Sequence, residues 1–228
     1  MGIKNILLLH GAIGAKDQML PLAEELKDKY KVHLLNFSGH GGNNFSCSFS
    51  IGKFAEEVLK YLEENKLEKA AIFGYSMGGY VALYLAFKYP ERVESVFTLA
   101  TKMQWTPDIA AKESRMLDVD ILKEKVPAFA EILKQRHTPN KLEEVLSKTA
   151  EMLQGMGQNP PLSSEFLKQI TCPVCIAIGE KDQMVSVEES LQASLLIPNS
   201  TCIPFPETPH PIEKVDIQKL ASEIKAFI

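Results

Sequence analysis

The chain has 228 residues, which suits one sizeable α/β domain and is short for two enzyme domains. Its 25 basic and 29 acidic residues give a net charge of −4, which offers no electrostatic footprint for nucleic acid or an anionic membrane. No apolar run approaches the roughly 20 residues that a membrane span needs, and no secretory signal pattern precedes the first apolar run. We therefore expect a cytoplasmic protein that acts on a small molecule, and the sequence leaves a homodimer open.

The four cysteines, at positions 47, 172, 175 and 202, are expected to remain unpaired in a chain without a secretory signal. Cys172 and Cys175 form a C-x-x-C motif, but this motif opens an apolar β-like run, whereas a redox pair lies at a helix N-terminus. A zinc site would also need a second pair of ligands that the sequence lacks. We interpret both residues as core packing and expect neither metal nor cofactor.

The first half of the chain alternates between strand and helix patterns. Ile3–Leu9 is apolar at every position, which is typical of a strand that is covered on both faces in a parallel sheet. A helical stripe follows, made of Met19, Leu22, Ala23, Leu26 and Tyr30. Val32–Phe37 is the next expected strand, and 38–44 is a loop of turn-forming residues.

The alternation continues with the clearest amphipathic helix of the chain, which begins at Ile51 and has Ser50 as its expected N-cap. A buried strand at 70–75, a helix at Tyr80–Tyr89 and a strand at Val93–Ala100 come next. This order predicts a mostly parallel sheet with right-handed crossovers.

Between residues 101 and 169 the alternation stops and only helical patterns remain. They cover 107–117, 120–137 with an interruption at Pro127, and 141–156. The α/β pattern then resumes with a strand at 172–179, a helix at 187–195, a strand at 200–204 and a terminal helix at 212–228. We therefore expect one domain over 1–228, with a core at 1–100 and 170–228 and a helical cap insertion at 101–169.

One motif stands out in this pattern, because the strand at 70–75 leads directly into Gly74-Tyr75-Ser76-Met77-Gly78 and then into a helix. A G-x-S-x-G sequence between strand and helix is typical of a nucleophile elbow, in which a strained turn exposes the serine hydroxyl. A serine hydroxyl is a weak nucleophile until a base takes its proton, and the base needs a carboxylate to orient it.

Four further segments complete a pattern that resembles the α/β-hydrolase superfamily over essentially the whole chain. They are His10-Gly11 after the first strand, Ser38-Gly39-His40-Gly41 after the second, Gly179-Glu180-Lys181-Asp182 after a late strand, and the late His210. The resemblance implies an α/β fold in which nucleophile, acid and base follow in that order along the chain. This chain lacks room for the two antiparallel strands that usually start such folds, so we expect a reduced sheet of about six strands.

The resemblance implies Ser76 as the nucleophile, His210 as the base and Asp182 as the acid. Glu180 is the nearer rival for the acid, and Asp216 falls beyond the histidine. The backbone N–H groups of Ala12 and Met77 would form the oxyanion hole. His10 and His40 are interpreted as residues that hold the loops by hydrogen bonds.

Several apolar side chains in the insertion suit either helix packing or the lining of an acyl pocket. They are Met103, Trp105, Met116, Met152 and Met156. Helix packing is the first interpretation of the whole set. If the insertion covers the site as a cap, Trp105, Met116 and Met152 are the ones expected to bind substrate.

Together these features predict a cofactor-free serine hydrolase that cleaves a carboxylic ester, a thioester or a similar small acyl substrate through an acyl-enzyme on Ser76. Acyl transfer, C–C bond hydrolysis and lyase chemistry use the same three groups and remain alternatives. A ligand-sensing homologue without useful turnover is an alternative from another class.

Overall fold

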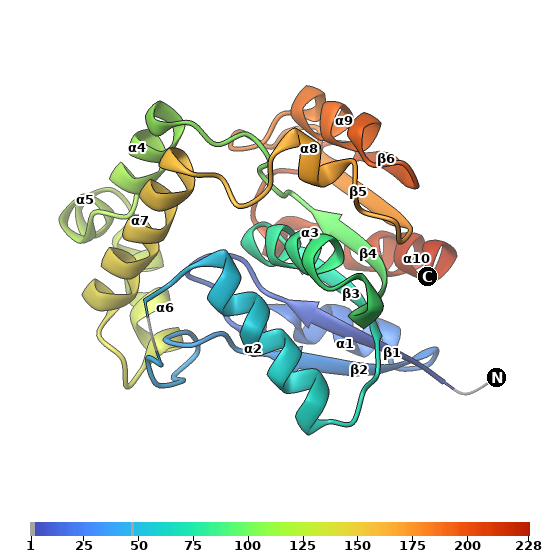
Figure 1. Ribbon diagram of the computed structural model, residues 1–228. Coiled ribbons are helices and arrows are strands. Elements are labelled where there is room, and N and C mark those ends of the chain that lie inside the picture. The colour runs from blue at the N-terminus through green and yellow to red at the C-terminus, as the bar shows by residue number, and fades with distance from the viewer. Residues whose placement is uncertain (1–2, 47) are drawn as a thin grey trace.

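The computed structural model describes residues 3–46 and 48–228, so the expectation for Cys47 lies outside the described residues. In the described part of the chain six strands form one sheet in the order β2-β1-β3-β4-β5-β6, and every neighbouring pair is parallel. The strands are β1 (Lys4–Leu9), β2 (Tyr30–Leu35), β3 (Ala70–Tyr75), β4 (Val93–Leu99), β5 (Val174–Gly179) and β6 (Ser200–Phe205). The predicted α/β architecture with a parallel sheet of six strands is confirmed (Figure 1).

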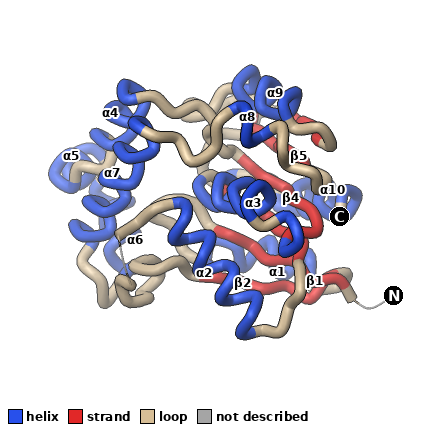
Figure 2. The backbone as a smooth tube through the Cα atoms, in the orientation of Figure 1, coloured by secondary structure: helices blue, strands red, loops and turns tan. Residues whose placement is uncertain are grey.

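The helices of the core cover both faces of this sheet (Figure 2). The helices α2 (Ile51–Glu64), α3 (Met77–Lys88) and α9 (Val187–Leu196) pack on one face. The helices α1 (Leu20–Leu26) and α10 (Ile217–Phe227) pack on the other. The central strand β3 is buried at all six positions, which is why its sequence is apolar without alternation.

Four helices of the insertion lie together to one side of the sheet, on the left in Figure 1. They are α4 (Pro107–Arg115), α5 (Val119–Lys125), α6 (Pro127–His137) and α7 (Leu142–Gln158). A small apolar cluster around Leu133 and Leu146 joins α5, α6 and α7, while Met152 and Met156 at the far end of α7 pack into the core of the main domain. A short helix that the sequence did not reveal, α8 (Ser164–Leu167), contacts α3 and α9 of the core. The group α4–α7 is called the cap below.

Several element boundaries differ from the expectation by a few residues, and two of the differences have a clear local cause. Tyr30 does not end the first helix: α1 ends at Leu26, and Tyr30 is the buried first residue of β2. Leu26 and Tyr30 are both buried and four residues apart, which is also the spacing of one helical turn. The terminal helix begins at Ile217 after a 3-10 turn, because Asp216 is its N-cap and its Oδ1 accepts a hydrogen bond from Lys219 N at 3.0 Å. The expected cap on α2 is confirmed, with Ser50 Oγ accepting from Lys53 N.

The C-x-x-C cysteines lie on opposite faces of the sheet. Cys175 is buried with the side chains under α1 and α10, and Cys172 packs against the cluster on the other face. Both thiols are free, as is that of Cys202. Burial raises the pKa of Cys175 to about 12 and that of Cys172 to about 11, so neither forms a thiolate readily.

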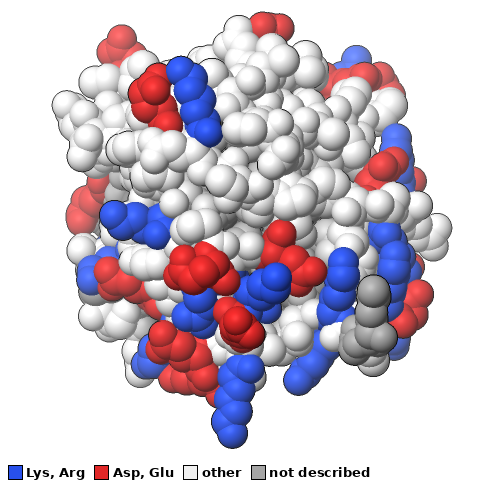
Figure 3. All heavy atoms as spheres, turned by 45° about the vertical axis from the view of Figure 1, so that its right-hand side comes forward, with Lys and Arg blue, Asp and Glu red and all other residues white. Residues whose placement is uncertain are grey.

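Charged side chains of both signs are mixed on the face that Figure 3 presents. Many of the ion pairs in the described residues join two exposed partners, such as Lys123 with Glu143 at 2.9 Å. None of the helices in the described residues combines the length and the apolar character that a membrane crossing requires.

Candidate active site

The turn between β3 and α3 has the geometry of a nucleophile elbow. Ser76 stands between the two elements with φ 51° and ψ −115°, a conformation that costs free energy for any residue with a Cβ atom. A Cβ atom added to Gly74 would lie 2.4 Å from the carbonyl carbon of Gly78, and one added to Gly78 would lie 2.5 Å from Leu9 O. Glycine is therefore required on both sides of the serine.

Neighbouring strands hold this strained turn in place by hydrogen bonds. Ser76 N donates to Leu99 O at the end of β4 at 2.8 Å, and the Thr101 hydroxyl donates to Ser76 O at 3.0 Å. The backbone of Ser76 is thus fixed from the side of β4, and the residue lines a cavity.

The turn after β5 and the loop after β6 bring Asp182 and His210 together. His210 Nδ1 lies 2.7 Å from Asp182 Oδ2, and the aspartate side chain is fully buried in this contact. The other carboxylate oxygen, Oδ1, accepts hydrogen bonds from Met184 N at 2.8 Å and Val185 N at 2.9 Å. Because all these donors face a carboxylate, Asp182 is held as an acceptor and His210 Nδ1 carries the proton.

Tyr75, which the sequence did not single out, supports the histidine from the other side. Its hydroxyl donates to His210 O at 3.0 Å, and the two rings lie 5.6 Å apart. Burial, with the nearby carboxylates of Glu213 and Asp182, raises the pKa of Tyr75 well above its usual value. The phenol therefore remains a proton donor to the loop at any working pH.

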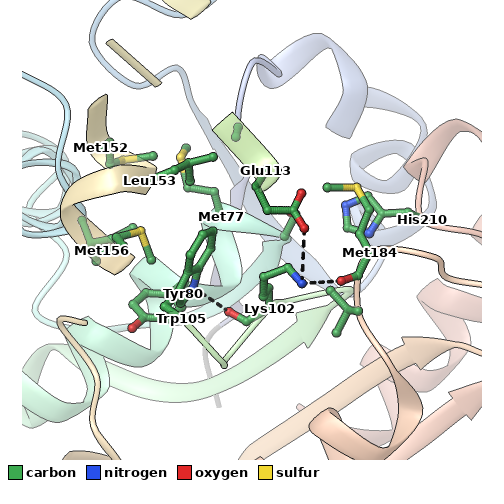
Figure 4. A pocket seen from close by; sticks show the side chains of 14 residues that line it. Met77, Tyr80, Lys102, Trp105, Glu113, Met152, Leu153, Met156, Met184 and His210 are labelled. Atoms are coloured by element: carbon green, nitrogen blue, oxygen red, sulfur yellow. Dashed lines mark hydrogen bonds and ion pairs between the residues drawn. The ribbon is translucent and has the colours of Figure 1, made fainter. Parts of the chain in front are cut away.

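A cavity of about 70 Å³ opens beside Ser76 and His210, between the core and the cap (Figure 4). Its walls are mainly apolar and include Trp105 before α4 and Met152 on α7, as predicted for these two residues. Met116, the third residue expected to bind substrate, does not line this cavity and is 58% exposed beyond the end of α4. In the part of the chain that the structure describes, the His210 ring is hydrogen-bonded to Asp182 and not to Ser76 Oγ. A contact between base and nucleophile often tightens only when substrate binds.

Ala12 and Met77, the residues expected to supply the oxyanion hole, also line this cavity. Met77 is the first residue of α3, so its N–H has no acceptor within the helix and points out of the helix N-terminus. Ala12 lies in the loop that follows β1, next to Ser76 across the sheet. Both residues therefore lie at the cavity wall beside Ser76, and their role as an oxyanion hole stays a prediction.

His10 and His40 do not line the cavity but tie loops together, together with His137 from the cap. Phe37 N donates to His10 Nε2 at 3.2 Å, and His10 Nδ1 bonds to Gly11 O at 2.8 Å. His40 Nδ1 bonds to Ser38 O at 2.9 Å. His137 on α6 bonds to Ile13 O at 2.9 Å and accepts from Gly41 N at 3.1 Å, which links the cap to the loop beside Ala12.

Two charged residues inside the cavity were missed by the sequence analysis. Lys102 follows β4, and its ammonium forms an ion pair at 3.5 Å with Glu113 on α4 and donates to Met184 O. Lys102 could have been noticed, because it comes just past the end of a predicted strand, where side chains converge on the site. Glu113 gives no such signal, since its sequence context is that of any polar helix position. Glu189, also missed, accepts from Met103 N and Gln104 N and so fixes the segment that carries Lys102 and Trp105.

The fold and the elbow together define a large class of proteins, and a comparison with known families identifies it. The family model described as alpha/beta hydrolase fold matches residues 4–157, and the chain belongs to this family. Within it, the chain is 27% identical over 227 residues to the pimeloyl-[acyl-carrier protein] methyl ester esterase of Aliivibrio salmonicida (strain LFI1238), which covers 90% of this chain and 85% of that protein.

Solved structures show the same fold. The structure of MenH from S. aureus has 24% sequence identity and a TM-score of 0.78, covering 100% of this chain and 94% of that one. A thermophilic esterase from Thermogutta terrifontis has 21% identity and a TM-score of 0.78, covering 98% and 88%.

No group of three or more His, Cys, Asp or Glu side chains in the described ranges is arranged to hold a metal ion.

Proposed function

We propose that this protein is a serine hydrolase that cleaves a small carboxylic ester, with Ser76 as nucleophile, His210 as base and Asp182 as the residue that orients the base. The observation that carries the proposal is the buried contact of 2.7 Å between His210 Nδ1 and Asp182 Oδ2, beside a cavity that Ser76 and His210 both line. A histidine fixed in this way presents its bare Nε2 as a base toward the nucleophile.

The reaction follows from the groups at the cavity. Ser76 Oγ attacks the ester carbonyl carbon while His210 Nε2 takes the hydroxyl proton, and Asp182 stabilises the imidazolium that forms. The N–H groups of Ala12 and Met77 donate to the oxygen that becomes negatively charged. His210 then passes the proton to the leaving alcohol. A water molecule, deprotonated by His210, attacks the acyl-enzyme and releases the carboxylic acid.

The size and walls of the cavity favour a short apolar group next to the reacting carbonyl. A volume of about 70 Å³ and a lining of alanine, methionine, leucine and tryptophan suit a short acyl or alkyl chain. The curated relative from Aliivibrio salmonicida is named for hydrolysis of a methyl ester, which agrees with a small alcohol part. A cytoplasmic location and a homodimer remain predictions from the sequence.

A fluorophosphonate probe tests the proposal, because it labels only an activated serine. We expect one labelled site, at Ser76, which is lost in Ser76→Ala without loss of the fold. A panel of p-nitrophenyl esters should be cleaved fastest with the shortest acyl chains. A Ser76→Ala protein that keeps wild-type esterase activity at verified purity would contradict the assignment, and a protein without labelling or turnover would favour the ligand-sensing alternative.

A further inference from the structure

Two opposite charges lie inside an otherwise apolar cavity, and the proposed catalytic groups do not use them. The side chain of Lys102 is 15% exposed and that of Glu113 is 11% exposed, and both line the cavity with Ser76. Figure 4 shows the two side chains pointing toward each other, with Met77 on one side and His210 on the other. Such a pair is a poor source of stability, because desolvation offsets most of the attraction.

The pair also has hydrogen-bonding capacity left over. Its separation of 3.5 Å is longer than the 2.7–2.9 Å typical of a charge-assisted hydrogen bond. Lys102 has three N–H donors, of which one goes to Met184 O. Within the described part of the chain Glu113 has Lys102 as the one polar partner of its carboxylate. The pair thus presents at least one donor and several acceptor sites to the cavity.

The other polar side chains in the wall are tied to the backbone. The Tyr80 hydroxyl accepts from Leu162 N at 3.1 Å, and the Trp105 indole N–H donates to Lys102 O at 3.3 Å. The Tyr80 hydroxyl keeps its own proton as a donor, but among the residues that line this wall the pair combines a charged donor with a charged acceptor.

The charges of the pair decide what kind of group it can bind. An anionic group near Lys102 would also lie near the Glu113 carboxylate, and a cationic group near Glu113 would lie near the ammonium, so each would meet repulsion at low dielectric. A neutral hydroxyl satisfies both partners, because its oxygen accepts from Lys102 Nζ while its proton is donated to Glu113. A hydroxyl oxygen of the substrate can lie beside the pair, about 2.8 Å from both Lys102 Nζ and the Glu113 carboxylate.

We propose that Lys102 and Glu113 form a subsite that selects neutral esters with a hydroxyl group near the scissile bond. This inference rests on the proposed hydrolase function and names the substrate class more closely. Lys102 lies on the core and Glu113 on the cap. A substrate hydroxyl that is hydrogen-bonded to both therefore connects the core to the cap next to Ser76.

Matched pairs of esters test the subsite, namely ethyl acetate with 2-hydroxyethyl acetate and methyl butyrate with methyl 3-hydroxybutyrate. We expect the wild-type kcat/KM to be at least about 10-fold higher for the hydroxylated member of one pair, as two hydrogen bonds to charged groups imply. In Glu113→Leu this ratio should fall to near one. In Glu113→Gln, where the Lys102 charge is no longer neutralised, the kcat/KM for monomethyl succinate relative to methyl butyrate should rise.

Glu113 is the residue to change because Lys102 also holds the Met184 backbone next to Asp182. Glu143→Gln is the matched control, since it breaks the exposed cap pair with Lys123 and should alter none of the ratios.

A wild-type ratio near one in both pairs of esters would overturn the subsite while leaving the hydrolase proposal intact. Ratios unchanged in both Glu113 variants, with all substrates lost in proportion to thermal stability, would show a purely structural ion pair. Absence of turnover on every ester, together with absence of Ser76 labelling, would overturn both proposals.

Discussion

At the residue scale, the two carboxylate oxygens of Asp182 have separate partners, and this explains why an amide side chain cannot replace the aspartate. Oδ2 faces His210 Nδ1, and Oδ1 accepts from the N–H groups of Met184 and Val185. An asparagine would keep its carbonyl oxygen for the two backbone donors, so its NH₂ group would face the histidine. His210 would then have to accept at Nδ1 and carry its proton at Nε2, where it cannot act as a base.

We therefore predict that Asp182→Asn lowers kcat for short esters by roughly 1,000 to 10,000-fold with little change in thermal stability. Steady-state kinetics together with thermal unfolding measure both effects. Asp216→Asn is the matched control, because Asp216 only caps α10 and asparagine is an equally good N-cap. Near-normal activity in Asp182→Asn would remove this residue from the assignment and bring Glu180 back as the acid.

At the element scale, the cap contributes to the cavity through α7 and through Glu113 on α4, and the segment before α4 adds Trp105, whereas other cap surfaces face solvent. Trp105 and Met152 line the cavity, and Met116 at the end of α4 does not. Substitutions of Trp105 and Met152 are therefore expected to change the substrate preference, whereas a substitution of Met116 is not.

Smaller side chains at the lining positions should enlarge the acyl pocket. We predict that Trp105→Leu and Met152→Val shift the preferred p-nitrophenyl ester toward longer acyl chains, and change turnover of the acetate ester less. Met116→Val, a control of similar chemistry outside the cavity, should leave the chain-length profile unchanged. If both lining variants lose every substrate in proportion to their loss of melting temperature, the cap is structural support and does not select the acyl group.

At the scale of the whole molecule, three buried histidines join the core loops to the cap. The His40 ring lies 5.1 Å from that of His10 and 5.6 Å from that of His137. His10 Nε2 and His137 Nδ1 each accept a backbone N–H, and His40 Nε2 is buried without a partner. Burial is the largest cause that lowers the pKa of all three, that of His10 to about 4.

This cluster predicts acid sensitivity with a definite sign. The unfolded chain has histidine pKa values near 6.5, so it binds protons in a pH range where the folded cluster stays neutral. The stabilisation is complete above about pH 6.5 and is lost as the pH falls below it, by up to about 1.4 kcal/mol per pH unit for each histidine. The melting temperature should be markedly lower at pH 5 than at pH 7.5, and His137→Gln should reduce the proton uptake on unfolding at pH 5. An equal melting temperature at both pH values would contradict the neutral cluster.

The sequence by itself determined the order of the six strands and of the longer helices along the chain, and the position of the elbow. These features are local: a run such as 70–75 is apolar because both faces of its strand are covered, and the glycines around Ser76 are required by the turn that contains them. Helix caps are equally local, as Ser50 shows. The pattern also indicated which side chains are buried, and for Tyr30 this was correct although the element was wrong.

Only the tertiary structure decided what the buried and half-buried side chains face. Trp105, Met152 and Met116 had equal claims in the sequence, yet the packing of the cap on the core turned two of them to the cavity and left the third in solvent. The Lys102–Glu113 pair joins residues from a strand end and a helix in different layers. The periodicity of apolar residues predicts whether a side chain is buried. Which side chains it contacts depends on the packing of elements that are far apart in the sequence, and no fixed spacing of residues encodes that packing.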